Sequence, residues 1–141
     1  LLGDDPIFVL NTDAFWAPES PRPLTHLAET FDADEMDVLL LLADMEQTLG
    51  FHGAGDFHLS GNGALTRRGD AARAPWAFAG ARIIRPQLYD DLPPEPFSAN
   101  EVWNDLIDTG RLHGLPMPEF WLHVGDPDAL DAANFWLKAA P

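Results

Sequence analysis

The sequence contains no cysteine and only one lysine, Lys138, among its 141 residues. The absence of cysteine excludes disulfides, zinc–thiolate sites and cysteine nucleophiles. Only 8 Lys and Arg residues stand against 23 Asp and Glu residues, which gives a formal net charge of -15. Because nucleic acids and acidic membrane surfaces are bound through clustered basic side chains, we expect neither as a partner.

Long apolar runs are also missing. The longest, Val38 to Ala43, is far shorter than the ~20 residues that a membrane-spanning helix needs. The opening residues, Leu-Leu-Gly-Asp-Asp, lack the basic region of a signal peptide, so we expect a cytoplasmic protein. What is present is a hydrophobic fraction of 46%, which is too apolar for a disordered chain and suits one folded domain.

Apolar patterns predict strands that alternate with helices. We expect strands at 7–10, 36–43, 76–84 and 120–124, and a hairpin over 57–66. We expect three helices. The first covers 24–31, the second begins at a capping box formed by Ser98 and Glu101, and the third begins at Asp126-Pro127. This alternation predicts an α/β fold around a mostly parallel sheet with a small hairpin. The four consecutive apolar residues at 7–10 are typical of a strand buried on both faces.

Polar residues directly follow or interrupt two of the predicted strands. Asn11-Thr12-Asp13 follows the first strand, and His123 lies in the last one. Ligands bind at the carboxyl ends of strands in open α/β sheets, and a carboxylate oxygen is the ligand that magnesium prefers, so Asp13 is a candidate metal or substrate contact. Asp13 could instead cap a turn, and a lone strand histidine is more often a hydrogen-bonded core residue than a ligand.

A glycine-rich segment and the tryptophans give weaker signals. Gly53-Ala54-Gly55-Asp56 lacks the spacing of a phosphate loop and is more simply a turn before the hairpin. Trp16 and Trp76 lie near predicted strand ends or loops, where an aromatic ring could stack on a sugar, whereas Trp103 is expected in the core.

Five segments, taken in order, resemble those of the sugar-1-phosphate nucleotidyltransferases. They are NTDAFW (11–16), GAGDF (53–57), FAGARIIRPQLY (78–89), PFSANEVWNDLIDTGRLHG (96–114) and FWLHVGDPDAL (120–130). Within that family the sequence resembles the N-acetylmuramate-1-phosphate uridylyltransferases and the mannose-1-phosphate guanylyltransferases. The resemblance implies a partial Rossmann-like nucleotide-diphospho-sugar transferase fold.

The resemblance also implies a reaction. In this family a sugar 1-phosphate attacks the α-phosphate of a nucleoside triphosphate and yields a nucleotide sugar and pyrophosphate, with Mg²⁺ offsetting the phosphate charge. Asp13 matches the first metal-binding aspartate, and His123 falls where the family has the second. Because imidazole is a poor ligand for magnesium, His123 would bind Mn²⁺, hold a metal-bound water or serve structure only.

Four further residues are expected to bind the sugar. Gly80 matches the glycine that lets the backbone approach the sugar, and Asp56 belongs to the segment near the sugar. Asn11 and Trp76 complete the expected substrate-binding residues. These assignments rest on the resemblance and on position in the predicted strands.

The family's glycine-rich start, which holds the triphosphate, has no match in this sequence. We therefore expect residues 1–141 to be the C-terminal portion of a single nucleotidyltransferase domain and to be inactive alone. An apolar sheet edge would then be exposed and would be covered by the missing N-terminal part or by a second copy. The alternatives are a non-catalytic relative that binds nucleotide sugars or regulates a partner, and an interaction module with an acidic face.

Overall fold

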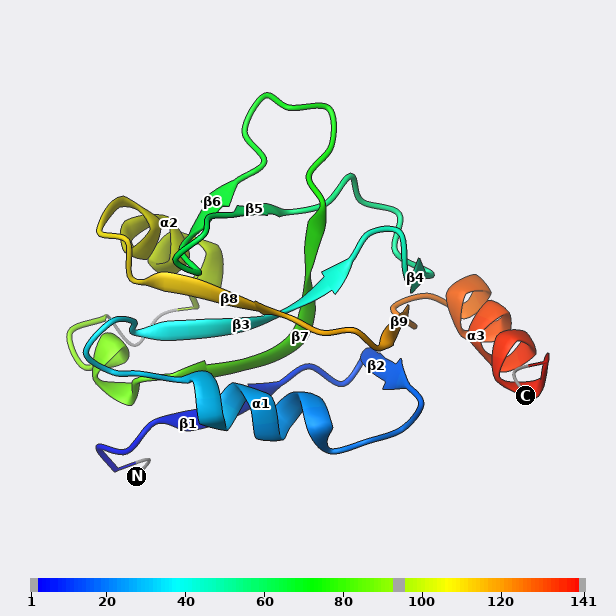
Figure 1. Cartoon of the computed structure of the whole chain (residues 1–141), viewed down its shortest axis with the longest axis horizontal. Helices are drawn as coiled ribbons and strands as arrows, with labels where there is room; N and C mark the ends of the chain where they lie inside the picture. The colour runs from blue at the N-terminus through cyan, green and yellow to red at the C-terminus, as the bar shows by residue number, and fades with distance from the viewer. Residues whose placement is uncertain (1–2, 93–95, 140–141) are drawn as a thin grey trace.

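The computed structural model describes residues 3–92 and 96–139 and arranges them around two sheets (Figure 1). In the larger sheet the order is β6-β5-β7-β3-β8, and β1 also pairs with β7. Its strands are β1 (Ile7–Leu10), β3 (Val38–Asp44), β5 (Phe57–Leu59), β6 (Leu65–Arg67), β7 (Trp76–Ile84) and β8 (Leu112–Pro116). The smaller sheet has the order β2-β9-β4. Its strands are β2 (Ala14–Ala17), β4 (Thr48–Leu49) and β9 (Phe120–His123).

Helices cover both faces of the larger sheet. α1 (Arg22–Thr30) packs on one face and α2 (Ala99–Asp108) on the other. A third helix, α3 (Pro127–Ala139), and a short 3₁₀ helix at Pro86–Tyr89 complete the helical elements of the described residues. Side chains alternate along β3, so Leu39 and Leu41 pack with Leu27 of α1, whereas Leu40 packs with Trp103 of α2 on the opposite face. Figure 1 shows α3 beyond β9, away from the larger sheet. None of the helices in the described residues is long and apolar enough to cross a membrane.

The expectation of a mostly parallel sheet is wrong. Strand β7 runs antiparallel to β1, β3 and β5, and the β2–β9 and β5–β6 pairs are antiparallel as well. Parallel pairing joins β3 to β8 and β4 to β9. The chain between β3 and β7 contains the short strand β4 and the β5–β6 hairpin but no crossover helix, and β7 returns beside β3 in the opposite direction. The mixed α/β character and the small hairpin are confirmed.

Strand β1 lies at an edge of the larger sheet, and the expectation that it is buried on both faces is also wrong. Phe8 is 45% exposed and Leu10 is 52% exposed. β7 pairs with one edge of β1, and none of the described strands pairs with the other. β1 therefore has the apolar sequence of a buried strand, but one of its edges is not paired with a described strand.

The starts of the helices and the longest strands lie close to their predicted positions. Three short strands were not predicted. β7 covers the predicted residues 76–84, and Asp126 Oδ1 accepts the N–H of Ala129 at 2.8 Å, as expected of an N-cap. The Ser98 hydroxyl also caps its helix, accepting the N–H of Asn100 at 3.2 Å, but the expected reciprocal bond from the Glu101 side chain is not among the hydrogen bonds of the described residues. The unpredicted strands are β2, β4 and β8; β8 contains both glycine and proline, which weaken the strand signal.

One buried carboxylate ties three neighbouring strands together at the end of the sheet. Asp37, 9% exposed, precedes β3, whereas Arg85 follows β7 and Arg111 precedes β8. Arg111 Nε lies 2.6 Å from Asp37 Oδ2, and Arg85 Nη1 lies 2.8 Å from Oδ1. The hydrogen bond from Arg111 holds the pKa of Asp37 below its ordinary value, although burial acts in the opposite direction.

The substitution Asp37→Asn should lower the free energy of unfolding by roughly 2 kcal/mol at pH 7, since two guanidinium groups lose their carboxylate. The folded-state pKa of Asp37 is depressed, so this contribution is present above the unfolded pKa of about 3.9 and is lost as the pH falls through the folded pKa. Urea unfolding at pH 7 and at decreasing pH measures the difference. Asp131→Asn, at an exposed position on α3, is the matched control, and an equal effect of the two variants at pH 7 would contradict this account.

Candidate functional site

A bulge in β7 at Gly80 organises the centre of the site. Residues 79–81 of β7 stand opposite Leu41 alone, and Gly80 has a φ of +90°, a conformation that L side chains rarely adopt. The bulge leaves two carbonyls for other partners. The Ala79 carbonyl accepts the indole N–H of Trp121 at 3.1 Å, and the Gly80 carbonyl accepts the N–H of Asn11 at 2.7 Å.

Asp56 supports the same strand from its free edge. β1 pairs with one end of β7 and β5 with the other, which leaves the edge near Phe78 without a strand partner. Asp56 Oδ2 accepts the N–H of Phe78 at 2.9 Å, and the Asp56 N–H donates to the Trp76 carbonyl at 2.7 Å. The Asp56 side chain thus replaces a missing strand at this point, and Oδ1 makes no hydrogen bond with a described residue.

These contacts surround a cleft of about 270 Å³. Five of the six predicted site residues line it: Asn11, Asp13, Asp56, Gly80 and His123. Trp76 is placed elsewhere, in a cavity of about 430 Å³ that Asp44 and Arg73 also line. Trp16, the other tryptophan considered for sugar stacking, lines a third cavity of about 630 Å³.

Asp13 and His123 meet because β2 pairs with β9. The pairing sets Ala14 opposite His123, and the Asp13 carbonyl accepts the N–H of Val124 at 2.7 Å. Asp13 Oδ2 then lies 3.6 Å from His123 Nε2. The Asp13 side chain is 49% exposed, so its carboxylate remains open to a ligand in the cleft.

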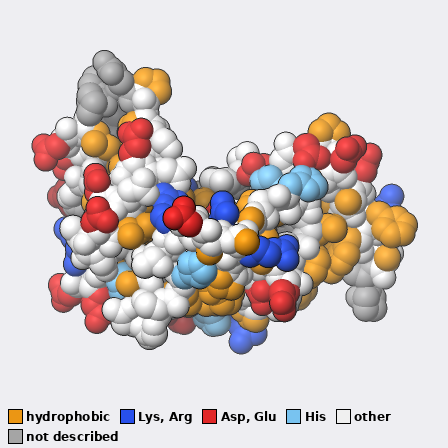
Figure 2. Space-filling model, turned by 90° about the horizontal axis from the view of Figure 1, so that it is seen from above, with side chains coloured by type: hydrophobic (Ala, Val, Ile, Leu, Met, Phe, Trp, Pro, Cys, Tyr) orange, Lys and Arg blue, Asp and Glu red, His pale blue; other side chains and the backbone are white. Residues whose placement is uncertain are grey.

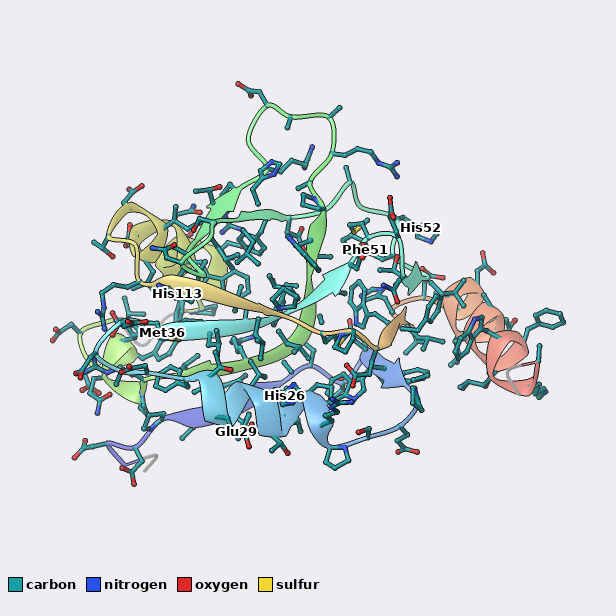
Figure 3. All side chains as sticks on the ribbon, viewed as in Figure 1. His26, Glu29, Met36, Phe51, His52 and His113 are labelled. Atoms are coloured by element: carbon teal, nitrogen blue, oxygen red, sulfur yellow. The ribbon has the colours of Figure 1, made fainter. Side chains whose placement is uncertain are left out.

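The His123 ring is held by close packing. Phe51 meets it edge-on with ring centroids 6.0 Å apart, and Figure 3 shows Phe51 on the segment after β4. A Cβ added to Gly125 would lie 2.6 Å from His123 Cε1, so a larger residue there would require the imidazole ring to shift. The buried Nδ1 atom of His123 has no hydrogen-bond partner among the described residues, which leaves the tautomer to be set by whatever binds Nε2.

The described residues do not contain three or more His, Cys, Asp or Glu side chains grouped to hold a metal ion. Figure 3 shows His26, His52 and His113 in three separate parts of the molecule. Asp13 and His123 are thus the nearby pair in the cleft. Magnesium is commonly held by one or two carboxylates together with substrate phosphates and water, so the Asp13 carboxylate suits a site shared with a substrate, whereas the His123 imidazole is a poor magnesium ligand.

The cleft also contains residues that sequence reasoning missed, chiefly Arg67 and Asn100. Trp103, expected in the core, is buried as predicted but also lines the cleft. Arg67-Arg68 is the only adjacent pair of basic residues in this acidic sequence, a signal that could have indicated an anion site. Figure 2 shows several Lys and Arg side chains between two raised parts of the surface, with Asp and Glu spread over both.

Comparison with known proteins confirms the resemblance drawn from the sequence. The chain is 37% identical over 140 residues to the N-acetylmuramate alpha-1-phosphate uridylyltransferase of Caulobacter vibrioides. The match covers 99% of this chain and 58% of that protein, so the chain spans little more than half of its relative. No protein-family model matches the chain.

Solved structures show the same fold at low sequence identity. The inositol-1-phosphate CTP transferase from T. maritima matches 98% of this chain and 56% of its own, with a TM-score of 0.64 and 14% identity. HddC from Yersinia pseudotuberculosis, complexed with GMP-PN, matches 97% and 57%, with a TM-score of 0.68 and 13% identity. The described α/β arrangement is therefore the fold of part of these proteins.

The substitution Gly80→Ala should disturb the cleft from its floor. An added Cβ would lie 3.1 Å from the Ala14 Cβ and 3.3 Å from the Asn11 Cβ, at a positive φ. We expect a loss of roughly 2 kcal/mol in the free energy of unfolding, measured by urea denaturation. Gly61→Ala is the control, because nothing lies within 4 Å of its added Cβ. Equal stability of the two variants would show that the bulge does not require glycine.

Proposed function

We propose that this chain is the acceptor-sugar side of an enzyme that joins a sugar 1-phosphate to a nucleoside triphosphate, giving a nucleotide sugar and pyrophosphate. The observation that carries the proposal is the cleft itself, which gathers Asn11, Asp13, Asp56, Gly80 and His123 from four separate segments. The 37% identity to a uridylyltransferase supports the same reaction class.

In this reaction an oxygen of the sugar 1-phosphate attacks the α-phosphorus, and the bond from that phosphorus to the pyrophosphate oxygen breaks. The protein contributes mainly by positioning the reactants and by stabilising charge. We assign to the exposed Asp13 carboxylate the role of holding a divalent cation, Mg²⁺ or Mn²⁺, against the phosphates. When bound, the cation would offset the negative charge that the two phosphate groups bring together.

His123 is the second proposed ligand. Its Nε2 atom lies beside Asp13 Oδ2, and the ring is fixed by Phe51 and Gly125, so Nε2 is presented to the cleft in one orientation. Imidazole nitrogen suits Mn²⁺ better than Mg²⁺, so we expect a protein with this pair to be active with manganese in place of magnesium.

The sugar is proposed to lie against the bulge of β7. Gly80 keeps the floor of the cleft free of a side chain, while the Asn11 amide and Asp56 Oδ1 supply hydrogen-bonding groups for sugar hydroxyls. Trp76 stays a predicted substrate contact only, since it lies outside the cleft.

The nucleoside triphosphate requires groups that this chain does not offer in its cleft. Arg67 is the only Lys or Arg among the described residues that line it. The relative is longer, and we propose that an additional N-terminal part supplies the nucleotide site and adds a strand to the open edge of β1, covering Phe8 and Leu10. A second copy of the chain at that edge is the alternative occupant.

Asp13→Asn in the full-length protein should lower the rate of pyrophosphate release by at least about 100-fold, since an amide is a much weaker ligand for a divalent cation than a carboxylate. A coupled pyrophosphate assay with UTP or GTP and several sugar 1-phosphates measures the rate. Asp108→Asn, at an exposed position that ends α2, should be unaffected. An unchanged rate in Asp13→Asn would remove this carboxylate from the mechanism.

The 141-residue chain alone should show no turnover in the same assay, because it lacks a cradle for the triphosphate. Robust turnover by this chain would contradict the proposal that a further part of the protein binds the nucleotide.

A non-catalytic relative that binds nucleotide sugars is the second candidate, favoured by the histidine at 123 in place of an aspartate. That candidate predicts metal-dependent nucleotide binding by the full-length protein in calorimetry and no pyrophosphate release with any sugar 1-phosphate.

A further inference from the structure

Trp76 is the predicted site residue that lies outside the cleft, and it lines a separate cavity. The volume of this cavity, about 430 Å³, is in the range of small-molecule sites. Trp76 begins β7 at the base of the loop 68–75, which projects from the sheet in Figure 1. Asp44, the last residue of β3, pairs with Trp76 and also lines the cavity. The cavity therefore lies where the β3–β7 pair ends and the two chains turn away.

Backbone hydrogen bonds hold the walls of this cavity in place. The Met45 N–H donates to the Pro75 carbonyl at 3.0 Å, which joins the turn after β3 to the end of the loop. The Ala74 N–H donates to the Ala54 carbonyl at 2.8 Å, and Ala74 is only 4% exposed. The end of the loop is thus anchored, so a ligand meets groups whose backbone positions are already fixed.

The polar side chains of the cavity are left unused by the chain. Asp44 Oδ1 accepts the N–H of Glu46 at 2.9 Å, which orients this carboxylate and leaves Oδ2 free for a ligand. Among the described residues, no ion pair or hydrogen bond engages the Glu46 carboxylate, the Arg73 guanidinium or the Trp76 indole N–H. The Trp76 ring packs against the core cluster that contains Phe57. The cavity therefore offers a supported aromatic ring with free donors and acceptors beside it.

This set of groups suits a neutral sugar. An indole ring can stack on the C–H face of a sugar ring, carboxylates accept hydrogen bonds from hydroxyl groups, and guanidinium and indole N–H groups donate to oxygen atoms. Two carboxylates disfavour a phosphate group, and the guanidinium disfavours a cation. An uncharged ligand rich in hydroxyl groups is the class that uses all of these groups without a contact between like charges.

We propose that this cavity binds a neutral mono- or disaccharide against Trp76, Asp44 and Arg73, at a site separate from the cleft. The inference goes beyond the proposed function, because that reaction takes a negatively charged sugar 1-phosphate in the cleft. It keeps the sugar-stacking role predicted for Trp76 and assigns this role to an uncharged ligand.

The indole N–H signals in a proton–nitrogen NMR spectrum of the full-length protein report on the two sites separately. The Trp76 signal is identified by its loss in Trp76→Phe, and the signal of Trp103, which lines the cleft, by its loss in Trp103→Phe. Titration with N-acetylglucosamine or maltose should shift the Trp76 signal with a Kd of roughly 1–10 mM. N-acetylglucosamine 1-phosphate should bind at Trp76 at least about 5-fold more weakly, because the carboxylates repel its phosphate.

Two substitutions test the polar groups without removing the ring. Arg73→Gln should weaken the binding of the neutral sugar at Trp76 roughly 10-fold, since an exposed charged donor is lost and the core is untouched. Asp44→Asn keeps the oxygen that accepts the Glu46 N–H and removes the charge, and it should also weaken binding. Arg22→Gln removes an exposed charge on α1 and should leave binding unchanged as the control.

Four results would overturn the inference. The first is a Trp76 signal that does not move up to about 50 mM of either sugar. The second is a shift of the Trp103 signal alone, which would place the sugar in the cleft. The third is an unchanged affinity in Arg73→Gln. The fourth is tighter binding at Trp76 of the sugar 1-phosphate or of uridine. Because NMR titration requires no turnover, each result stands whether or not the protein transfers nucleotides.

Discussion

Strand β7 binds three different parts of the chain through backbone groups near Gly80. At the bulge it offers two carbonyls to Trp121 and Asn11, and the gap between β1 and β5 leaves the Phe78 N–H to Asp56. Each of these bonds is worth only about 1 kcal/mol, but an unpaired buried backbone group costs more than that. The bulge thus fixes β9 and the residues after β1 relative to the hairpin, and the cleft forms where they meet.

Charge gives the cleft its chemical character. The chain is strongly acidic, and the charged side chains that line the cleft are two carboxylates, Asp13 and Asp56, and one guanidinium, Arg67. Asp56 is partly used by the backbone of Phe78, and Arg67 is held by amides, so each keeps atoms for a ligand. A polar substrate with a phosphate and further hydrogen-bonding groups suits this arrangement better than an apolar one.

The sequence predicted the main elements, and five of the six residues that it singled out line one cleft. β7 and the caps of α2 and α3 were predictable because their signals are local. The direction of β7 was not, because strand direction depends on connections that periodicity does not encode. Strand β2, four half-buried residues, was missed, although its pairing with β9 is what joins Asp13 to His123. Arg67 was missed because its role depends on α2, more than thirty residues away.

We propose that the carboxylate after β1 and the bulge of β7 together form one end of a phosphate-transfer site. Crystals of the full-length protein grown with Mn²⁺ and a sugar 1-phosphate test it most directly, because manganese is located by anomalous scattering. We expect an anomalous peak in contact with an Asp13 oxygen and the sugar ring against Gly80. A manganese ion bound away from Asp13, or a sugar bound in a different cavity, would contradict it.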